Sequence, residues 1–140
     1  MKPGALVVVL LALAGPLSAQ ETSDQQARRL LEDGRAYQAQ GKSKQALDNF
    51  NIVVSSFPNT DSVGQALLEI GRYHMEVEND TAKARAAFEQ VTKQYARSDA
   101  APGAYYYQGQ LTLNRATTPA EIEDALAQFA RVETLYPSSP

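Results

Sequence analysis

The fold is decided by the stretch from Ala27 to Pro58, ARRLLEDGRAYQAQGKSKQALDNFNIVVSSFP. Small and apolar residues recur every three or four positions on both sides of Gly41, which is the pattern of two amphipathic helices. Gly41 fits the C-terminal cap of the first helix, and Pro58 cannot continue the second. The stretch therefore predicts two antiparallel helices joined by a short turn.

The same arrangement returns twice downstream. Glycines recur 37 and 38 residues apart, at Gly34, Gly71 and Gly109. Phenylalanines recur 38 and 41 residues apart, at Phe50, Phe88 and Phe129. A glycine inside a helix costs about 1 kcal/mol relative to alanine, so three glycines in register indicate a packing requirement.

These positions make a specific packing prediction. We expect each glycine to face a small residue of the partner helix, and these residues are Ala46, Ala84 and Ala125. Each phenylalanine would then fill the gap toward the next helix pair. The alternative is a chance alignment within an ordinary helical bundle.

The spacing resembles the tetratricopeptide repeat (TPR) family, whose sequence signal lies in small and aromatic packing residues. In the first unit the matching positions are Gly34, Tyr37, Ala46, Phe50 and Pro58. The resemblance covers about residues 24–140. It implies an all-α fold, an α-solenoid of three TPR-like antiparallel helix pairs, with units at residues 27–60, 61–98 and 99–140.

Several helix starts can be predicted from capping residues. Ser23 followed by Gln26 fits a capping box, and Ser43 fits the N-cap of the second helix. The run Thr118-Pro119-Ala120-Glu121 combines a capping box with proline at the first helical position. Pro102 is tolerated only in the first turn of the fifth helix.

The N-terminal segment differs from the rest of the chain. Residues 1–19 combine Lys2, an apolar run and a small-residue cleavage site, which is typical of a secretory signal peptide. An uncleaved membrane anchor is the alternative, although the apolar run is short for crossing a bilayer. Residues 20–26 form a polar lead. We therefore expect a periplasmic or secreted protein.

One detail narrows the resemblance to a subgroup of TPR proteins, and another departs from that subgroup. The long repeat period, with Phe57-Pro58 and Tyr136-Pro137 closing the first and third units, is similar to periplasmic TPR proteins of envelope assembly, such as the outer-membrane assembly lipoproteins and the Tol–Pal-associated coordinator of cell division. Gln20 stands where a lipoprotein carries its lipid-bearing cysteine, and the chain has no cysteine. Lipidation through that residue is therefore excluded.

Composition argues against several other functions. The net charge is only −3 and no block of like charges occurs, so nucleic acid is a poor partner. With one histidine and no cysteine we expect no metal site and no cofactor. His74 occupies the position of Tyr37, so we interpret it as a packing residue rather than a general base. No catalytic grouping is present, and the protein is not expected to be an enzyme.

In the TPR family the first helix of each pair lines a concave groove. Carrying the family's groove positions over by the glycine register gives Arg28, Leu31, Arg35, Gln38, Gln65, Leu68, Arg72, Met75, Tyr106, Gln110 and Leu113. This mixture of guanidinium, apolar and amide groups suits an extended peptide or a partner helix that carries an acidic residue. The alternative is an ordinary hydrated face.

The resulting hypothesis is an exported TPR scaffold that binds a protein or peptide partner in bacterial cell-envelope assembly. The end of the last pair would leave an apolar face uncovered. This leaves two alternatives open: an N-terminal TPR appendage of a larger, enzymatic envelope protein, and self-association through the uncapped C-terminal end.

Overall fold

The fold is known from a computed structural model that describes residues 21–137. It consists of six α-helices, α1 (Ser23–Ala39), α2 (Ser43–Ser56), α3 (Ser62–Glu76), α4 (Thr81–Gln94), α5 (Ala101–Leu113) and α6 (Pro119–Leu135). No strand occurs within residues 21–137, so the all-α prediction is confirmed. The predicted signal peptide lies outside the described residues.

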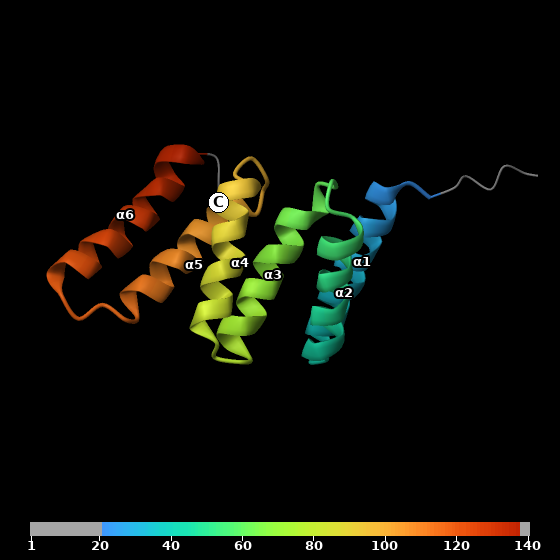
Figure 1. Cartoon of the computed structure of the whole chain (residues 1–140), viewed down its shortest axis with the longest axis horizontal. Coiled ribbons are helices and arrows are strands. Elements are labelled where there is room, and N and C mark those ends of the chain that lie inside the picture. The colour runs from blue at the N-terminus through green and yellow to red at the C-terminus, as the bar shows by residue number, and fades with distance from the viewer. Residues whose placement is uncertain (1–20, 138–140) are drawn as a thin grey trace, which may run out of the picture.

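The helices pack as three successive antiparallel pairs, α1–α2, α3–α4 and α5–α6 (Figure 1). Consecutive pairs touch through α2 against α3 and α4 against α5. In addition α1 contacts α3 and α3 contacts α5, whereas α2, α4 and α6 do not contact one another within the described chain. The odd-numbered helices therefore form one continuous layer, which we call the α1–α3–α5 face.

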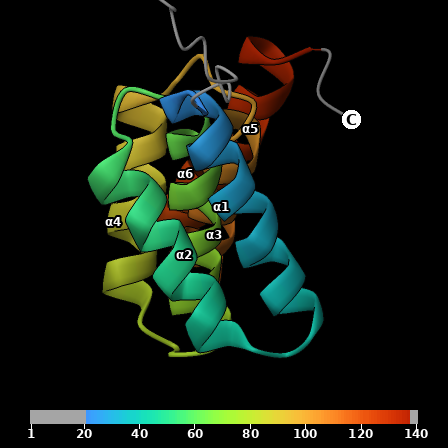
Figure 2. The ribbon, with the colours of Figure 1, turned by 90° about the vertical axis from the view of Figure 1, so that its right-hand side faces the viewer.

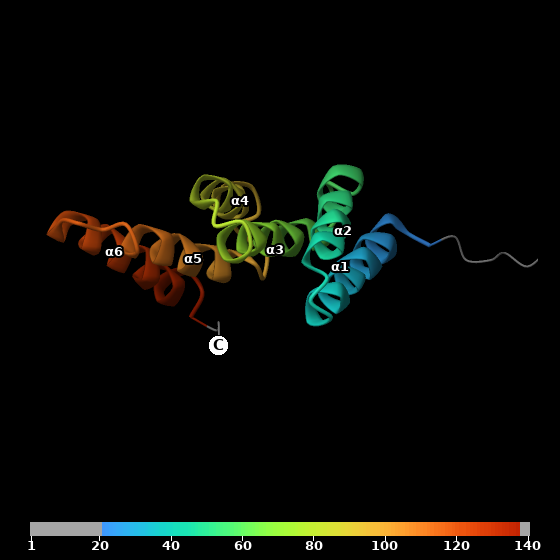
Figure 3. The same ribbon diagram turned by 90° about the horizontal axis from the view of Figure 1, so that it is seen from below.

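Two further views make this arrangement visible. Seen end-on, α1 and α2 lie in front of the other helices, as the first unit of a stack (Figure 2). Seen from below, α4 lies to one side of α3 while α5 continues along the array from α3 (Figure 3). The array is thus extended along one axis, as expected for a solenoid of helix pairs.

The repeated glycines lie closest to the repeated phenylalanines. A Cβ added to Gly34 would lie within 2.9 Å of Phe50 Cδ1, and one added to Gly71 within 2.7 Å of Phe88 Cδ1. The atoms nearest to each glycine thus belong to a phenylalanine ring, and not to the predicted Ala46, Ala84 or Ala125. In each pair the phenylalanine ring of the second helix lies directly on the glycine backbone of the first helix. The glycine is therefore required for packing within a pair.

Helix starts agree with the cap predictions in part. The capping box of α1 is formed by Thr22 and Gln25, one residue earlier than predicted, and Ser23 is the first helical residue. Lys42, not Ser43, is the N-cap of α2 and makes no side-chain cap bond. The box of Thr118 and Glu121 around Pro119 is confirmed.

Helix α1 ends as predicted. Its C-cap is Gln40, and the following Gly41 has a φ of 72°. This left-handed conformation costs glycine no steric energy, and it turns the chain sharply into α2.

The third pair is less covered than the first two. Phe50 and Phe88 are fully buried, whereas Phe129 is only half-buried. Five large apolar side chains of α5 and α6 are between 42% and 57% exposed: Tyr106, Leu113, Ile122, Leu126 and Leu135. At the C-terminal end of α6, the Tyr136 hydroxyl donates a hydrogen bond to the Ala96 carbonyl at 2.7 Å. This bond connects the end of the helix to the α4–α5 turn.

Candidate partner-binding face

The predicted groove residues all lie on α1, α3 and α5, but they differ in accessibility. The exposed ones are Arg28, Arg35, Tyr106 and Leu113, and the half-buried ones are Gln38, Gln65, Leu68, Arg72, Met75 and Gln110. Leu31 is only 6% exposed and belongs to the hydrophobic core. Its helix turns it toward the packed interior, so its side chain cannot serve a partner as predicted.

The expected apolar strip is also largely used for packing. Leu68 lies over Gly103, where an added Cβ would come within 3.1 Å of Leu68 Cδ2. Met75 is packed against the core. The accessible part of the α1–α3–α5 face is therefore polar on α1 and α3, and it becomes apolar only at Tyr106 and Leu113.

The centre of this face is Glu69, a residue that the sequence patterns did not single out. The residue is only 6% exposed. It accepts hydrogen bonds from Arg35 Nε at 3.4 Å, Gln38 Nε2 at 3.4 Å and Arg72 Nη1 at 3.1 Å. A buried carboxylate is stable only when its charge is paired and its oxygens are bonded. Glu69 therefore fixes side chains of two consecutive pairs.

A signal for Glu69 was present in the sequence. It is the one charged residue in the otherwise apolar run from Ala66 to Ile70 of the third predicted helix. Arginines occupy the same groove position in the first two units, at Arg35 and Arg72. A charge placed in an apolar run, with two guanidiniums at equivalent positions, indicates a buried ion pair.

Arg35 and Arg72 are held on several sides. Arg35 Nη2 also donates to Gln65 Oε1 at 2.9 Å. The Arg72 guanidinium lies 5.8 Å from the centre of the Tyr107 ring, and that ring stacks on Phe88 with centroids 5.3 Å apart. Such a cation–π contact links α3 to α5. The polar network therefore spans all three pairs.

Arg72 stays protonated, and therefore positively charged. Partial burial lowers its pKa, but attraction to Tyr107, Glu69 and Glu76 outweighs this effect, so the pKa of Arg72 lies above its ordinary value. Arg72 Nε donates to Glu76 Oε1 at 3.4 Å, and the Glu76 side chain is half-exposed. The guanidinium thus remains a permanent cation at the edge of the face.

A hollow of about 260 Å³ adjoins Arg72. It lies between the α1–α2 turn and the C-terminal end of α3. Its lining includes polar groups from both pairs, namely Gln38, Ser43, Arg72, Tyr73 and Glu76. Small-molecule sites usually enclose roughly 300–1,000 Å³, so this hollow is of the size that receives a single side chain.

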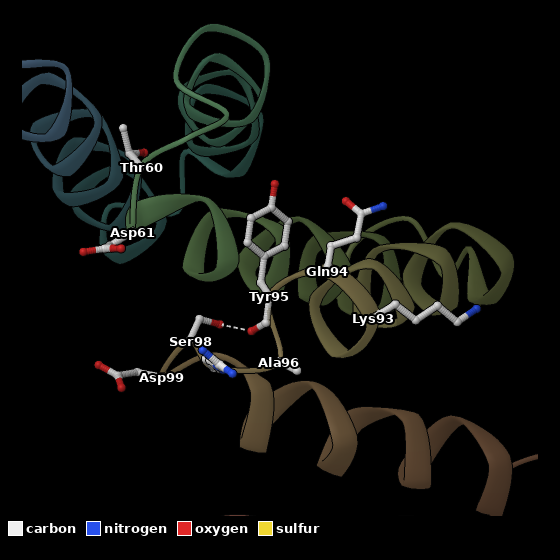
Figure 4. Close-up of a pocket in the computed structure, with 9 residues that line it drawn as sticks. Thr60, Asp61, Lys93, Gln94, Tyr95, Ala96, Ser98 and Asp99 are labelled. Atoms are coloured by element: carbon white, nitrogen blue, oxygen red, sulfur yellow. Dashed lines mark hydrogen bonds between the residues drawn. The ribbon is translucent and has the colours of Figure 1, made fainter.

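A larger hollow, of about 610 Å³, lies elsewhere, at the corner where the α2–α3 and α4–α5 turns meet (Figure 4). Asp61 and Asp99 lie at one end of it and Lys93 at the other. Ser98 Oγ donates to the Tyr95 carbonyl at 2.7 Å, so its polar groups are partly used within the turn. Neither sign of charge dominates this corner.

His74 lies in an ion-pair cluster at the α3–α4 turn. Its Nδ1 is 2.9 Å from Glu78 Oε2, which also accepts from Lys83 Nζ at 3.2 Å. These two hydrogen bonds, that of His74 first, lower the pKa of Glu78. Among the described residues no group of three or more His, Cys, Asp or Glu side chains could hold a metal ion.

None of the described helices combines the length and the apolar character that crossing a bilayer requires.

Comparison with known proteins gives one match. The family model described as "Tetratricopeptide repeat" matches residues 34–60 and 65–98. These segments cover much of the first two helix pairs, including the glycine and phenylalanine of each. Neither the curated proteins nor the solved structures yielded a match. The family match and the repeated helix pairs together support a TPR protein, of a family that generally mediates protein–protein interaction as a non-enzymatic scaffold.

Proposed function

We propose that the α1–α3–α5 face binds a protein or peptide partner, and that the protein is an exported scaffold of bacterial cell-envelope assembly. The observation that carries the binding face is the network around Glu69. It holds Arg35, Gln38 and Arg72 in place on the layer shared by all three pairs. Side chains that are already ordered lose little entropy on binding, so such a surface is prepared for a partner.

The test is capture of partners from envelope extract with immobilised protein. The double variant Arg35→Gln with Arg72→Gln should lose the captured partner, because the two guanidiniums that Glu69 holds in place are removed. The matched control is Lys44→Gln with Arg85→Gln, which makes the same charge change on the outer helices α2 and α4. Equal capture by both double variants would place the binding surface elsewhere, and circular dichroism melting confirms that both are folded.

Export has a separate test. The apolar segment of residues 1–19 supports it by its composition alone. Cell fractionation should find the protein outside the cytoplasm, and sequencing of its N-terminus should begin at Gln20. A cytoplasmic protein that retains Met1 would contradict export and leave the binding face unaffected.

The exposed apolar side chains of α5 and α6 favour a second candidate function, self-association through this end. Sedimentation equilibrium should then show a mass that rises with protein concentration. The Leu126→Lys variant should remain monomeric under the same conditions, because a charge would be buried in the contact. A wild-type monomer at every concentration would exclude this candidate.

A further inference from the structure

We infer that the hollow beside Arg72 receives an acidic side chain of the partner, which takes the place now held by Glu76. This inference rests on the proposed binding function of the α1–α3–α5 face. It adds the chemistry of one anchor, a carboxylate of an aspartate or glutamate. The guanidinium of Arg72 is shared among several neighbours.

Two edges of that guanidinium have different partners. Arg72 Nη1 donates to the buried Glu69, and Nε donates to the half-exposed Glu76. The Nε–H and one Nη2–H lie along a common edge, which is the edge that binds a carboxylate through two parallel hydrogen bonds. Glu76 uses only the Nε–H of this edge, at a long 3.4 Å. The edge is therefore incompletely used in the free protein.

Glu76 is a weak competitor. It is paired with Arg72 four residues earlier on the same helix and is half in solvent. Exposed pairs of this kind contribute little, because solvent screens them. A partner carboxylate that replaces Glu76 with two short bonds leaves the charge next to Arg72 unchanged, so no uncompensated charge is created.

The rest of the network stays intact during this exchange. Glu69 keeps the Nη1–H of Arg72 and also keeps Arg35 and Gln38 as donors. The ring of Tyr107 supports the guanidinium from the side of α5. Glu69 is thus a positioning residue, which holds Arg72 through Nη1 and leaves the Nε–Nη2 edge to the half-exposed Glu76.

The hollow supplies further groups for an incoming carboxylate. The Gln38 amide and the Ser43 hydroxyl line it opposite α3, and both can donate a hydrogen bond. Its volume of about 260 Å³ fits one side chain, whereas it is small for a helix or a drug-sized molecule. Size, donors and charge therefore agree on a single acidic side chain.

The experiment uses two peptides that differ in one group. One is an acetylated and amidated heptapeptide of alanine and glutamine around a central glutamate, and its twin has a central glutamine. Each is titrated into 15N-labelled protein, and the Nε–H signals of Arg35 and Arg72 are followed by NMR. The glutamate peptide should shift the Arg72 signal in a saturable and salt-sensitive way, and the glutamine twin should not.

Variants test whether the peptide carboxylate displaces Glu76, because each variant should change the affinity for the glutamate peptide in a stated direction. Glu76→Gln should tighten binding of the glutamate peptide about two- to threefold, because the competitor is removed. Glu89→Gln is the matched control, since Glu89 makes an i,i+4 pair with Lys93 on α4 and its loss changes the net charge equally. It should leave the affinity unchanged. Arg72→Lys keeps the charge but loses the two-bond edge, and should weaken binding about tenfold.

The outcomes are separable from those of the proposed function. Identical titrations with the two peptides would overturn the acidic anchor, even if partner capture from extract succeeds. Equal tightening by Glu76→Gln and Glu89→Gln would also overturn it, because net charge alone would explain the effect. If the peptides differ as expected while capture does not depend on Arg35 and Arg72, the hollow binds a carboxylate but the partner does not use it, and both the proposed function and its anchor fail.

Discussion

The second and third helix pairs share the same internal contact but differ in what covers it. In α3–α4 the Phe88 ring lies on Gly71 and is covered from the next pair by the stacked ring of Tyr107. In α5–α6 the Phe129 ring lies on Gly109 in the same way, yet Phe129 stays half-buried beside exposed apolar neighbours. The glycine–phenylalanine contact therefore forms within a pair, whereas full burial requires the following pair.

The largest expected effect is the removal of the covered ring. Phe88→Ala should lower the free energy of unfolding by about 3–5 kcal/mol, because it opens a cavity in a filled core. Phe129→Ala should cost only about 1–2 kcal/mol, since part of that ring already faces water. Urea denaturation of the two variants measures both values. Equal losses would show that Phe129 is covered in solution, and the contrast between the pairs would fail.

The glycines give a smaller effect with an unusual sign. Alanine normally stabilises a helix interior by about 1 kcal/mol relative to glycine. Here an added Cβ would overlap a phenylalanine ring, so Gly71→Ala should destabilise the protein by about 1–3 kcal/mol.

Gly109→Ala is the matched variant for this comparison. It should cost less than Gly71→Ala, because the ring of Phe129 can shift toward solvent. Chemical denaturation provides the measurement. A Gly71→Ala variant that is more stable than the wild type would mean that the close contact is absent.

A lysine substitution at a leucine tests directly how far the neighbouring helices cover that position. Leu47 and Leu126 occupy the same repeat position, three residues before their phenylalanines, but Leu47 is half-buried against the core and Leu126 is 57% exposed. Leu126→Lys should change stability by less than about 0.5 kcal/mol, as surface substitutions usually do. Leu47→Lys should cost about 1–2 kcal/mol through lost burial. Differential scanning calorimetry ranks the two, and the reverse order would contradict the contrast.

The smallest expected effect concerns the start of α6, which depends on its own capping box. Hydrogen bonds from the Thr117 and Thr118 amides lower the pKa of Glu121 below the ordinary glutamate value of 4.5. A carboxyl whose folded pKa is depressed stabilises the fold above its unfolded pKa, and this contribution is lost as pH falls through the folded pKa.

The corresponding variant is Glu121→Ala. It should lower the Tm slightly at pH 7, and the difference from wild type should shrink as the pH is brought below 4.5, where the glutamate of the folded protein becomes protonated. Thermal melts across this pH range provide the check. A difference that grows on acidification would reverse the sign and refute the role of the charged cap.

The parts of the fold that were predictable depend on local patterns. Gly41, Pro119 and the Thr118 box act through the backbone of their own helix ends, so composition alone indicates where those helices end or begin. The start of α1 was misplaced by one residue because Thr22–Gln25 and Ser23–Gln26 are both acceptable capping boxes. Which of them forms depends on the orientation of the whole helix.

The candidate site was harder to predict, because its members are assigned by contacts between pairs. The register placed Arg35, Gln38 and Arg72 on one layer, and they do lie there. It could not tell that Leu31 is buried, or that Glu69 would collect donors from two helices. Burial of a charge is decided by the groups that surround it, and two of the three donors to Glu69 come from residues more than thirty positions away.

By itself the sequence determined a repeated helical hairpin, because period, glycine spacing and stop signals are properties of each segment. Only the tertiary structure decided that glycine packs on phenylalanine, and that Glu69 is the centre of the α1–α3–α5 face. Both depend on side chains of different helices meeting at a fixed distance. That distance is set by packing of the pairs, which no single segment encodes.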